Sequence, residues 1–326
     1  MEISRIWVAM LTRNIDNAGT DDPITLTINT DGVERLSKTF SDTGQKDQER
    51  SQANLYQVDV AGRNIVTEEL TNSSIRVGIG GGDAWRPEHV MVWGEGRTLF
   101  DTAIVPLAIE TDITTQLSTQ SSEGPPGMPL RLVERGNQNL QINRLFMLLT
   151  TGGGQSDVGF PASTVGNTKP GTASPLEIQI VSEGHLVVLS EIRNTTQEDL
   201  EAGGANFYSA PVIAPFRKRD LDNRSITLRI KGLDDWEPLS FFIFGLDDAA
   251  GRPERLVPLV HLPRWPHGNM KADSTTGVAS VNLQLTPEPL VPIAPDQGQV
   301  AVALNSIASG QEKVIELLQK LLAKQK

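Results

Sequence analysis

The segment Leu70-Thr71-Asn72-Ser73-Ser74-Ile75-Arg76-Val77-Gly78-Ile79 has a second version 151 positions later, Leu221-Asp222-Asn223-Arg224-Ser225-Ile226-Thr227-Leu228-Arg229-Ile230. At the end of both versions, three apolar residues alternate with polar or small ones. A period of two is that of a β-strand with one buried face. The pair therefore predicts an all-β fold, and it predicts that the fold is built from a repeat.

The same spacing extends well beyond this strand. At an offset of 151 it relates four further pairs: Asp83 and Asp234, Trp85 and Trp236, Pro87 and Pro238, Gly94 and Gly245. At an offset of 152 it relates the segments 53–56 and 205–208, and the segments 105–107 and 257–259. One spacing that holds to within a residue over so long a stretch indicates an internal duplication.

The strands inside each copy fall into two kinds. The segments 24–28 and 176–180 alternate between apolar and polar residues, which is typical of a half-buried antiparallel strand. The segments 90–93 and 241–244 are apolar throughout, so we expect them to be more fully covered. Many short strands in a chain with 29 Gly and 20 Pro predict two stacked antiparallel sheets in each copy.

The repeat divides the chain into four predicted parts. These are a β-sandwich with an extension over residues 1–138, a second one over 139–286, a proline-rich linker over 287–299, and an amphipathic helix over 300–326. The second copy contains an additional glycine-rich loop at about 151–163, which we interpret as an insertion.

The bulk composition excludes several classes of protein. The net charge of −11 and the pI of about 4.9 argue against a nucleic-acid-binding protein, which normally carries a basic surface. The chain contains no cysteine, so it has neither disulfides nor thiolate metal sites. We find neither a secretion signal nor an apolar run long enough to span a bilayer. The expected location is the cytoplasm, or a particle assembled there.

Three motifs of the first copy resemble a known family. Leu11-Thr12-Arg13, the loop Asn17-Ala18-Gly19-Thr20-Asp21-Asp22, and Trp85 shortly before an apolar strand are similar to the PLAT (LH2) domain. The resemblance covers roughly residues 3–96, and the second copy shares it over roughly 143–247. It implies two tandem PLAT-like β-sandwiches of eight strands, and it implies a module that binds lipid or protein.

Some PLAT domains bind calcium through their acidic loop. Carried over to this chain, the candidate ligands are Asp16, Asp21 and Asp22. The second copy has Ala173 and Ser174 at the positions of Asp21 and Asp22, so we expect no ion there. The alternative is a solvated acidic turn, in which Asp and Asn serve turn formation. Apart from calcium in the first domain, we expect no cofactor.

The usual catalytic patterns are missing from the sequence. No Gly-x-Ser-x-Gly segment is present, and no histidine pair has metal-binding spacing among His89, His185, His261 and His267. Asp83 and Asp234 each precede the repeated tryptophan by two residues, which suggests a turn cap rather than a catalytic group. We therefore predict that the chain is not an enzyme.

Two features are candidate contacts with partners. Arg217-Lys218-Arg219 is the most basic cluster, and the first copy has acidic residues at the corresponding place. Such a cluster is either a solvated face or a head-to-tail docking site between subunits. Trp265, close to prolines on both sides, is the tryptophan that we expect to be exposed as a contact residue.

The C-terminal region changes to a helical period. Its seam, interrupted by the polar Gln311, has spacings of four and three and contains six apolar residues: Val300, Leu304, Ile307, Val314, Leu318 and Leu321. An isolated helix of this length is marginal in water, so it needs a partner. We predict self-association through this helix, and the alternative is packing on the chain's own second sandwich.

Three functional classes follow from these features. The first is a non-catalytic structural or adaptor protein that binds protein partners in a larger assembly, such as a bacterial or phage-like particle, and forms a homo-oligomer. The second is a calcium-assisted peripheral lipid-binding protein, for which a membrane is an alternative partner. The third, with least support, is an enzyme or the targeting part of a hydrolytic system.

Overall fold

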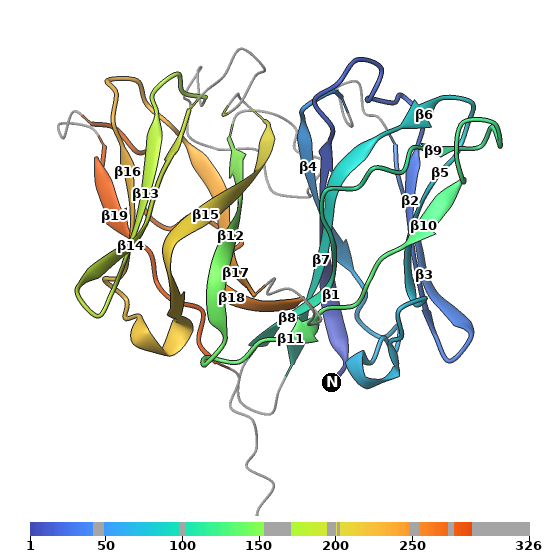
Figure 1. The fold of residues 1–326 in the computed structure, drawn as a ribbon, viewed down its shortest axis with the longest axis horizontal. Coiled ribbons are helices and arrows are strands. Elements are labelled where there is room, and N and C mark those ends of the chain that lie inside the picture. The colour runs from blue at the N-terminus through green and yellow to red at the C-terminus, as the bar shows by residue number, and fades with distance from the viewer. Residues whose placement is uncertain are drawn as a thin grey trace, which may run out of the picture. The chain divides into compact units, whose positions relative to one another are not determined.

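We analysed a computed structural model of the chain. It describes residues 1–41, 49–97, 102–152, 171–193, 200, 203–247, 254–272 and 277–288. The chain forms two compact units, Met1–Pro289 and Leu290–Lys326, and all described residues belong to the first. The described residues form mainly antiparallel sheets and two three-residue 3-10 helices, so the all-β prediction is confirmed (Figure 1).

The first half of this unit contains two four-stranded layers. Its inner layer has the order β8-β7-β1-β4, with the strands β1 (Ile3–Thr12), β4 (Ala53–Asp59), β7 (Pro87–Arg97) and β8 (Thr102–Glu110). Its outer sheet has the order β10-β5-β2-β3, with the strands β2 (Ile24–Thr30), β3 (Val33–Phe40), β5 (Ile75–Ile79) and β10 (Gly127–Pro129). The 3-10 helix η1 (Thr67–Glu69) precedes β5, and a small pair is formed by β6 (Ala84–Trp85) and β9 (Leu117–Ser118).

The second half is arranged in the same way. Its inner layer has the order β18-β17-β12-β15, with the strands β12 (Gln141–Thr151), β15 (Ala205–Arg217), β17 (Pro238–Asp247) and β18 (Arg255–Leu262). Its outer sheet has the order β19-β16-β13-β14, with the strands β13 (Leu176–Ser182), β14 (His185–Ile192), β16 (Ile226–Ile230) and β19 (Ser280–Asn282). The 3-10 helix η2 (Lys218–Asp220) precedes β16. Strand for strand, the order of both layers is that of the first half.

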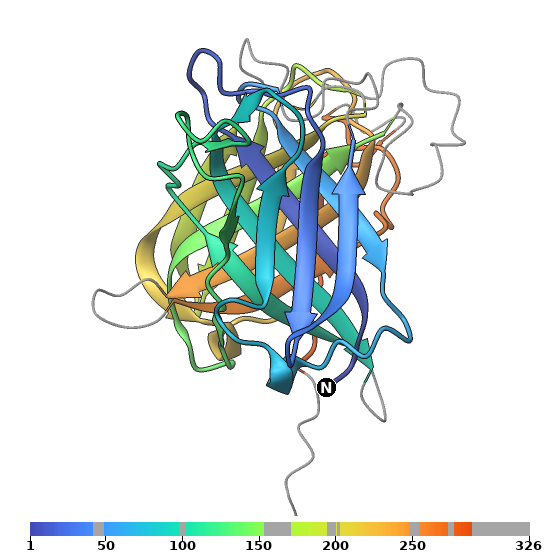
Figure 2. The ribbon, with the colours of Figure 1, turned by 90° about the vertical axis from the view of Figure 1, so that its right-hand side faces the viewer.

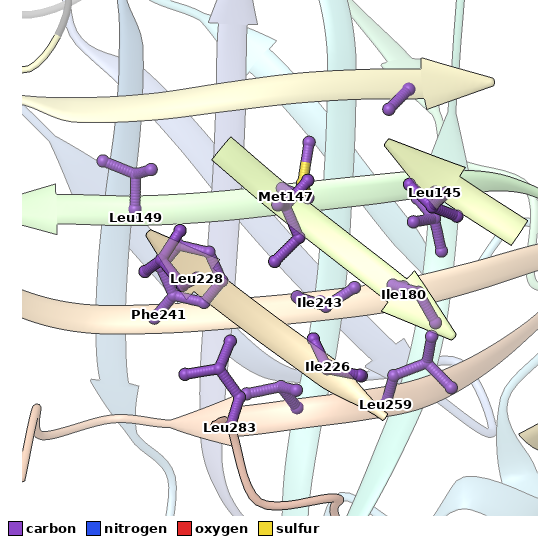
Figure 3. Close-up of a cluster of buried hydrophobic side chains, with 14 of the residues drawn as sticks. Leu145, Met147, Leu149, Ile180, Ile226, Leu228, Phe241, Ile243, Leu259 and Leu283 are labelled. Atoms are coloured by element: carbon purple, nitrogen blue, oxygen red, sulfur yellow. The ribbon is translucent and has the colours of Figure 1, made fainter. Parts of the chain in front are cut away.

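Each half has its own hydrophobic core between its inner and outer layers. The strands of the outer sheets bury alternate residues, as Ile226, Leu228 and Ile230 show on β16. In Figure 3 the side chains of Ile226 and Leu228 meet those of the inner strands, which cross beneath them at an angle, among them Phe241 and Ile243. Figure 2 shows the first half from the side of its outer sheet, with the strands behind running obliquely to it.

A third core lies between the two inner layers. There Trp7, Met91 and Trp93 of the first half pack against Phe242 and Phe244 of the second, and all five are fully buried. The inner strands are therefore covered on both faces, which explains their unbroken apolar runs and confirms the predicted fuller burial of 90–93 and 241–244.

The two inner layers are joined into one nine-stranded sheet. At one edge Ala53 on β4 pairs with Ala205 on β15. At the other edge β11 (Glu134–Arg135) runs parallel to β18, while Val133, just before it, donates its backbone N–H to Leu107 on β8. Backbone hydrogen bonding therefore joins both edges of the two inner layers, and the aromatic core lies between them.

Candidate functional site

The acidic loop between β1 and β2 is held by contacts within the chain. Asp16 forms an ion pair with Arg50, Asp21 is exposed, and Asp22 accepts a hydrogen bond from the backbone N–H of Asp83 at 2.5 Å. Among the residues that the structure describes, no three Asp, Glu or His side chains are grouped to hold a metal ion. Calcium binding at Asp16, Asp21 and Asp22 stays a prediction of the sequence.

The second half shows what Asp22 does for the fold. There Ser174 accepts the backbone N–H of Asp234 through its Oγ at 3.0 Å, as Asp22 accepts that of Asp83. In addition, Asp83 and Asp234 accept the backbone N–H of the residue that follows each of them. Asp22 and Ser174 therefore tie the loop before the first outer strand to the turn that precedes the repeated tryptophan, and the aspartates in that turn act as turn caps.

The expectation that Trp265 is an exposed contact residue is wrong. Its side chain is only 9% exposed and lies against Trp236 and Phe241, with 6.3 Å between ring centroids in each case. Its indole Nε1 donates to the carbonyl oxygen of Gly268 at 2.7 Å. The segment after β18 folds back over the second core, because its tryptophan buries more apolar area there than it would in a free loop.

The basic cluster is split by the fold. Arg217 and Arg219 are exposed, but Lys218 is buried and its Nζ lies 2.7 Å from Oε1 of Glu288. Burial lowers the pKa of Lys218, and the hydrogen bond with Glu288 partly opposes this shift. Lys218 is thus not available to a partner, contrary to the sequence prediction, and the ion pair instead fastens the end of the described chain.

The predicted oligomerisation helix lies outside the described residues. This applies to all six of its apolar seam positions, Val300, Leu304, Ile307, Val314, Leu318 and Leu321. It also applies to residues 289–299 of the linker and to residues 153–163 of the glycine-rich loop. Among the described residues, no helix has the length and apolar character needed to cross a bilayer.

A buried polar network lies at the boundary between the two halves. Trp7 on β1 and Trp93 on β7 are paired in register, and their rings stack with centroids 5.9 Å apart. Arg5, two residues before Trp7, and Glu95, two residues after Trp93, face the same side and form an ion pair of 2.8 Å. From the second half, His261 on β18 reaches this group.

The hydrogen bonds of this network are specific. Trp7 donates its Nε1 hydrogen to Oε1 of Glu95 at 2.8 Å, and Trp93 donates its own to Nε2 of His261 at 3.3 Å. The pKa of His261 is lowered to about 3, first by burial and then by the charge of Arg5. His261 is therefore a neutral imidazole that accepts a hydrogen bond through Nε2.

His89 is a second buried histidine at the same boundary. It belongs to β7, its Nδ1 accepts the backbone N–H of Asp112 at 3.2 Å, and its ring lies 5.6 Å from that of Phe207 in the second half. Burial is the largest cause that lowers its pKa. Each histidine is thus held neutral against aromatic rings that come from the other half.

A pocket of about 320 Å³ opens beside the His261 network. Glu95 and His261 line it together with the apolar side chains of Ile104, Leu262 and Leu285. Thr286 also lines it and is only 8% exposed, and its Oγ1 has no hydrogen-bond partner among the described residues. An unpaired buried hydroxyl costs about 1–3 kcal/mol, and no contact among the described residues offsets this cost for Thr286.

Only a weak signal for this pocket is present in the sequence. Glu95 follows the apolar run of β7 and His261 follows that of β18, so each is a titratable residue at the end of a strand that is otherwise buried. Such residues are rarely buried without a partner. The sequence did not indicate that the two strands face each other.

The second half also exposes apolar side chains at positions where the first half has polar or small residues. Leu186 and Leu189 on the edge strand β14 are 39% and 53% exposed, and Ile213 on the neighbouring β15 is 63% exposed. At an offset of 152, the first half has Glu34, Ser37 and Ala61 at these positions. Exposed apolar side chains on an edge strand are a feature of protein contact sites.

Comparisons with known proteins identify no relative by sequence. No family model and no curated protein matches the chain. Among solved structures, the alpha toxin from Clostridium absonum is similar to part of it, with 20% identity and a TM-score of 0.31. The match covers 40% of this chain and 32% of the toxin chain, and it carries no argument about function.

Proposed function

We propose that this protein is a non-catalytic structural or adaptor component that binds protein partners within a larger assembly. The observation that carries the proposal is the aromatic core between the two inner layers, in which Trp7 and Trp93 meet Phe242 and Phe244. This contact and the paired edges of the inner layers join the two sandwiches into one body. Such a body holds its outer sheets at a fixed spacing, which suits a building block.

We also propose that the two halves are copies of one PLAT-like domain. The identical strand order of both layers supports this assignment. So does a repeated buried hydrogen bond, in which Trp85 donates its Nε1 to Thr12 at 2.9 Å and Trp236 donates its own to Thr151 at 3.0 Å. Each pair joins the end of one inner strand, β1 or β12, to the segment just before the neighbouring inner strand, β7 or β17.

Partner binding is assigned to the surface of the second half around Leu189 and Ile213. These side chains are exposed on and beside an edge strand, where the first half has polar or small residues. Self-association is assigned to the heptad seam of the C-terminal region. In this arrangement one region connects copies of the chain, and a different surface holds the partner.

Light scattering coupled to size exclusion tests the proposal on the full chain. One chain has a mass of 35.4 kDa, and we expect the wild type to have the mass of two or more chains. We expect the double variant Val314→Asp/Leu318→Asp to reduce this mass to that of one chain. Gln319→Asp, which adds a charge beside the seam, is the matched control and should leave the mass unchanged. A wild-type protein of one chain's mass at all concentrations would contradict self-association.

A vesicle flotation experiment with and without calcium tests the lipid-binding alternative. The protein is mixed with anionic vesicles in calcium or in chelator and floated on a gradient. The proposed function predicts no flotation under either condition. Flotation that needs calcium and is lost in Asp21→Asn/Asp22→Asn would favour a peripheral lipid-binding protein instead.

A further inference from the structure

We infer that the pocket between the two halves binds a neutral, polyhydroxylated small molecule of the size of one sugar ring. It is formed by the ends of β7 and β8 in the first half, and by the end of β18 and the segment 284–287 in the second. Small-molecule sites commonly lie between domains and combine apolar walls with a few placed polar groups. This site is formed by other residues than the partner surface assigned around Leu189 and Ile213.

The polar groups of the pocket supply both donors and acceptors. Thr286 offers a buried hydroxyl whose hydrogen and lone pairs are unused among the described residues. The carboxylate of Glu95 accepts one bond at each oxygen, from Trp7 and from Arg5, and keeps further acceptor capacity. A hydroxyl group both donates and accepts, so a ligand with several hydroxyls matches both kinds of polar group on this wall.

The electrostatics of the pocket favour a neutral ligand. The charge of Glu95 is compensated by Arg5, so the wall offers no unpaired charge to an anion. A cation finds this carboxylate already paired with Arg5 at 2.8 Å, and the neutral His261 offers no charge of its own. Desolvation of a charged ligand would therefore have no matching gain inside the pocket.

The walls and the volume set the size of the ligand. Ile104, Leu262 and Leu285 add apolar surface to the pocket beside the polar groups, which suits the C–H face of a ring. A pocket of about 320 Å³ lies at the lower end of the range of roughly 300–1,000 Å³ for small-molecule sites. The wall that carries Thr286 is anchored, because the N–H of Thr286 donates to Leu259 and Glu288 pairs with Lys218.

Indole N–H signals in the nuclear magnetic resonance spectrum of the full chain give a direct readout. Trp7 and Trp93 donate to Glu95 and His261, which line the pocket, whereas Trp85 and Trp236 donate to threonines in the two separate cores. The probes are D-glucose, D-galactose and myo-inositol, with glucosamine and glucose 6-phosphate as charged counterparts. We expect at least one neutral probe to move the Trp7 and Trp93 signals saturably, while those of Trp85 and Trp236 stay in place.

The variant Thr286→Val tests the role of the buried hydroxyl. It keeps the shape of the side chain and should weaken binding of the neutral probe at least tenfold. Thr227→Val on the outer sheet is the matched control and should bind as the wild type does. The inference is overturned if no neutral probe moves the two signals at 50 mM, if a charged counterpart binds more tightly, or if Thr286→Val binds like the wild type.

Discussion

Trp93 of the first half donates its indole hydrogen to Nε2 of His261 of the second half, across a distance of 3.3 Å. The acceptor nitrogen must be unprotonated for this bond to form. The hydrogen bond therefore connects the protonation state of one side chain to the contact between the two sandwiches.

This connection predicts a loss of stability in mild acid. The pKa of His261 is lowered from 6.5 to about 3 in the folded state, so between these values the unfolded chain binds a proton that the folded chain does not. The stabilisation is complete above pH 6.5 and is lost as the pH falls toward 3. We expect the free energy of unfolding in urea to drop by about 1–2 kcal/mol from pH 7 to pH 5.

The variant His261→Gln separates this effect from other titrations. Glutamine accepts a hydrogen bond but does not titrate, so the drop between pH 7 and pH 5 should become smaller. His89, whose pKa is also lowered by burial, accounts for part of the remainder. An unchanged pH profile in His261→Gln would show that the histidine does not control the acid sensitivity.

The ion pair of Lys218 and Glu288 should stabilise the end of the described chain. Glu288→Gln leaves the buried ammonium of Lys218 without its counter-charge, and we expect a loss of about 1–2 kcal/mol in chemical unfolding. This is less than for a fully buried pair because Glu288 is 37% exposed. Lys218→Met in the same background should restore much of the loss, since it removes the charge and keeps the volume.

The repeated tryptophan–threonine bonds should contribute equally to the two halves. Thr12→Val and Thr151→Val each leave a buried indole N–H without its acceptor, and each should lower the free energy of unfolding by about 1–2 kcal/mol. Both are compared with Thr227→Val, whose hydroxyl lies on the exposed face of β16. A large cost in one half and none in the other would contradict the structural equivalence of the two pairs.

The aromatic core between the inner layers should make unfolding cooperative. The indole signals of Trp85 and Trp236, one in each half, should disappear together during a urea titration of the wild type. Phe242→Ala removes a fully buried ring from this core and should cost about 3–5 kcal/mol. Two separate transitions in the wild type would show that the halves unfold independently.

The strands themselves could be predicted from the sequence. Alternation in the segments 24–28 and 226–230 marks the outer strands, because one face of each is covered and the other is solvated. The unbroken apolar run at 90–93 correctly indicated burial on both faces. An apolar run does not say what covers it, so the sequence did not predict the contact between the inner layers.

Individual side chains were harder to place for the same reason. Trp265 lies between Pro263 and Pro266, which indicated an exposed loop. The loop instead folds back onto the second core. Lys218 stands in a basic triplet, but its position in η2 turns it inward to Glu288, 70 residues further along the chain. Contacts at such separations depend on the fold and leave no local pattern.

The shared aromatic core also has a consequence for synthesis on the ribosome. The first half emerges before the second half, which covers its inner layer. The face with Trp7, Met91 and Trp93 therefore stays exposed to water until the second half has been made. At about 5–20 residues per second, that interval is on the order of 10 s. A nascent chain with such an exposed apolar surface needs either protection by a chaperone or rapid synthesis of its second half.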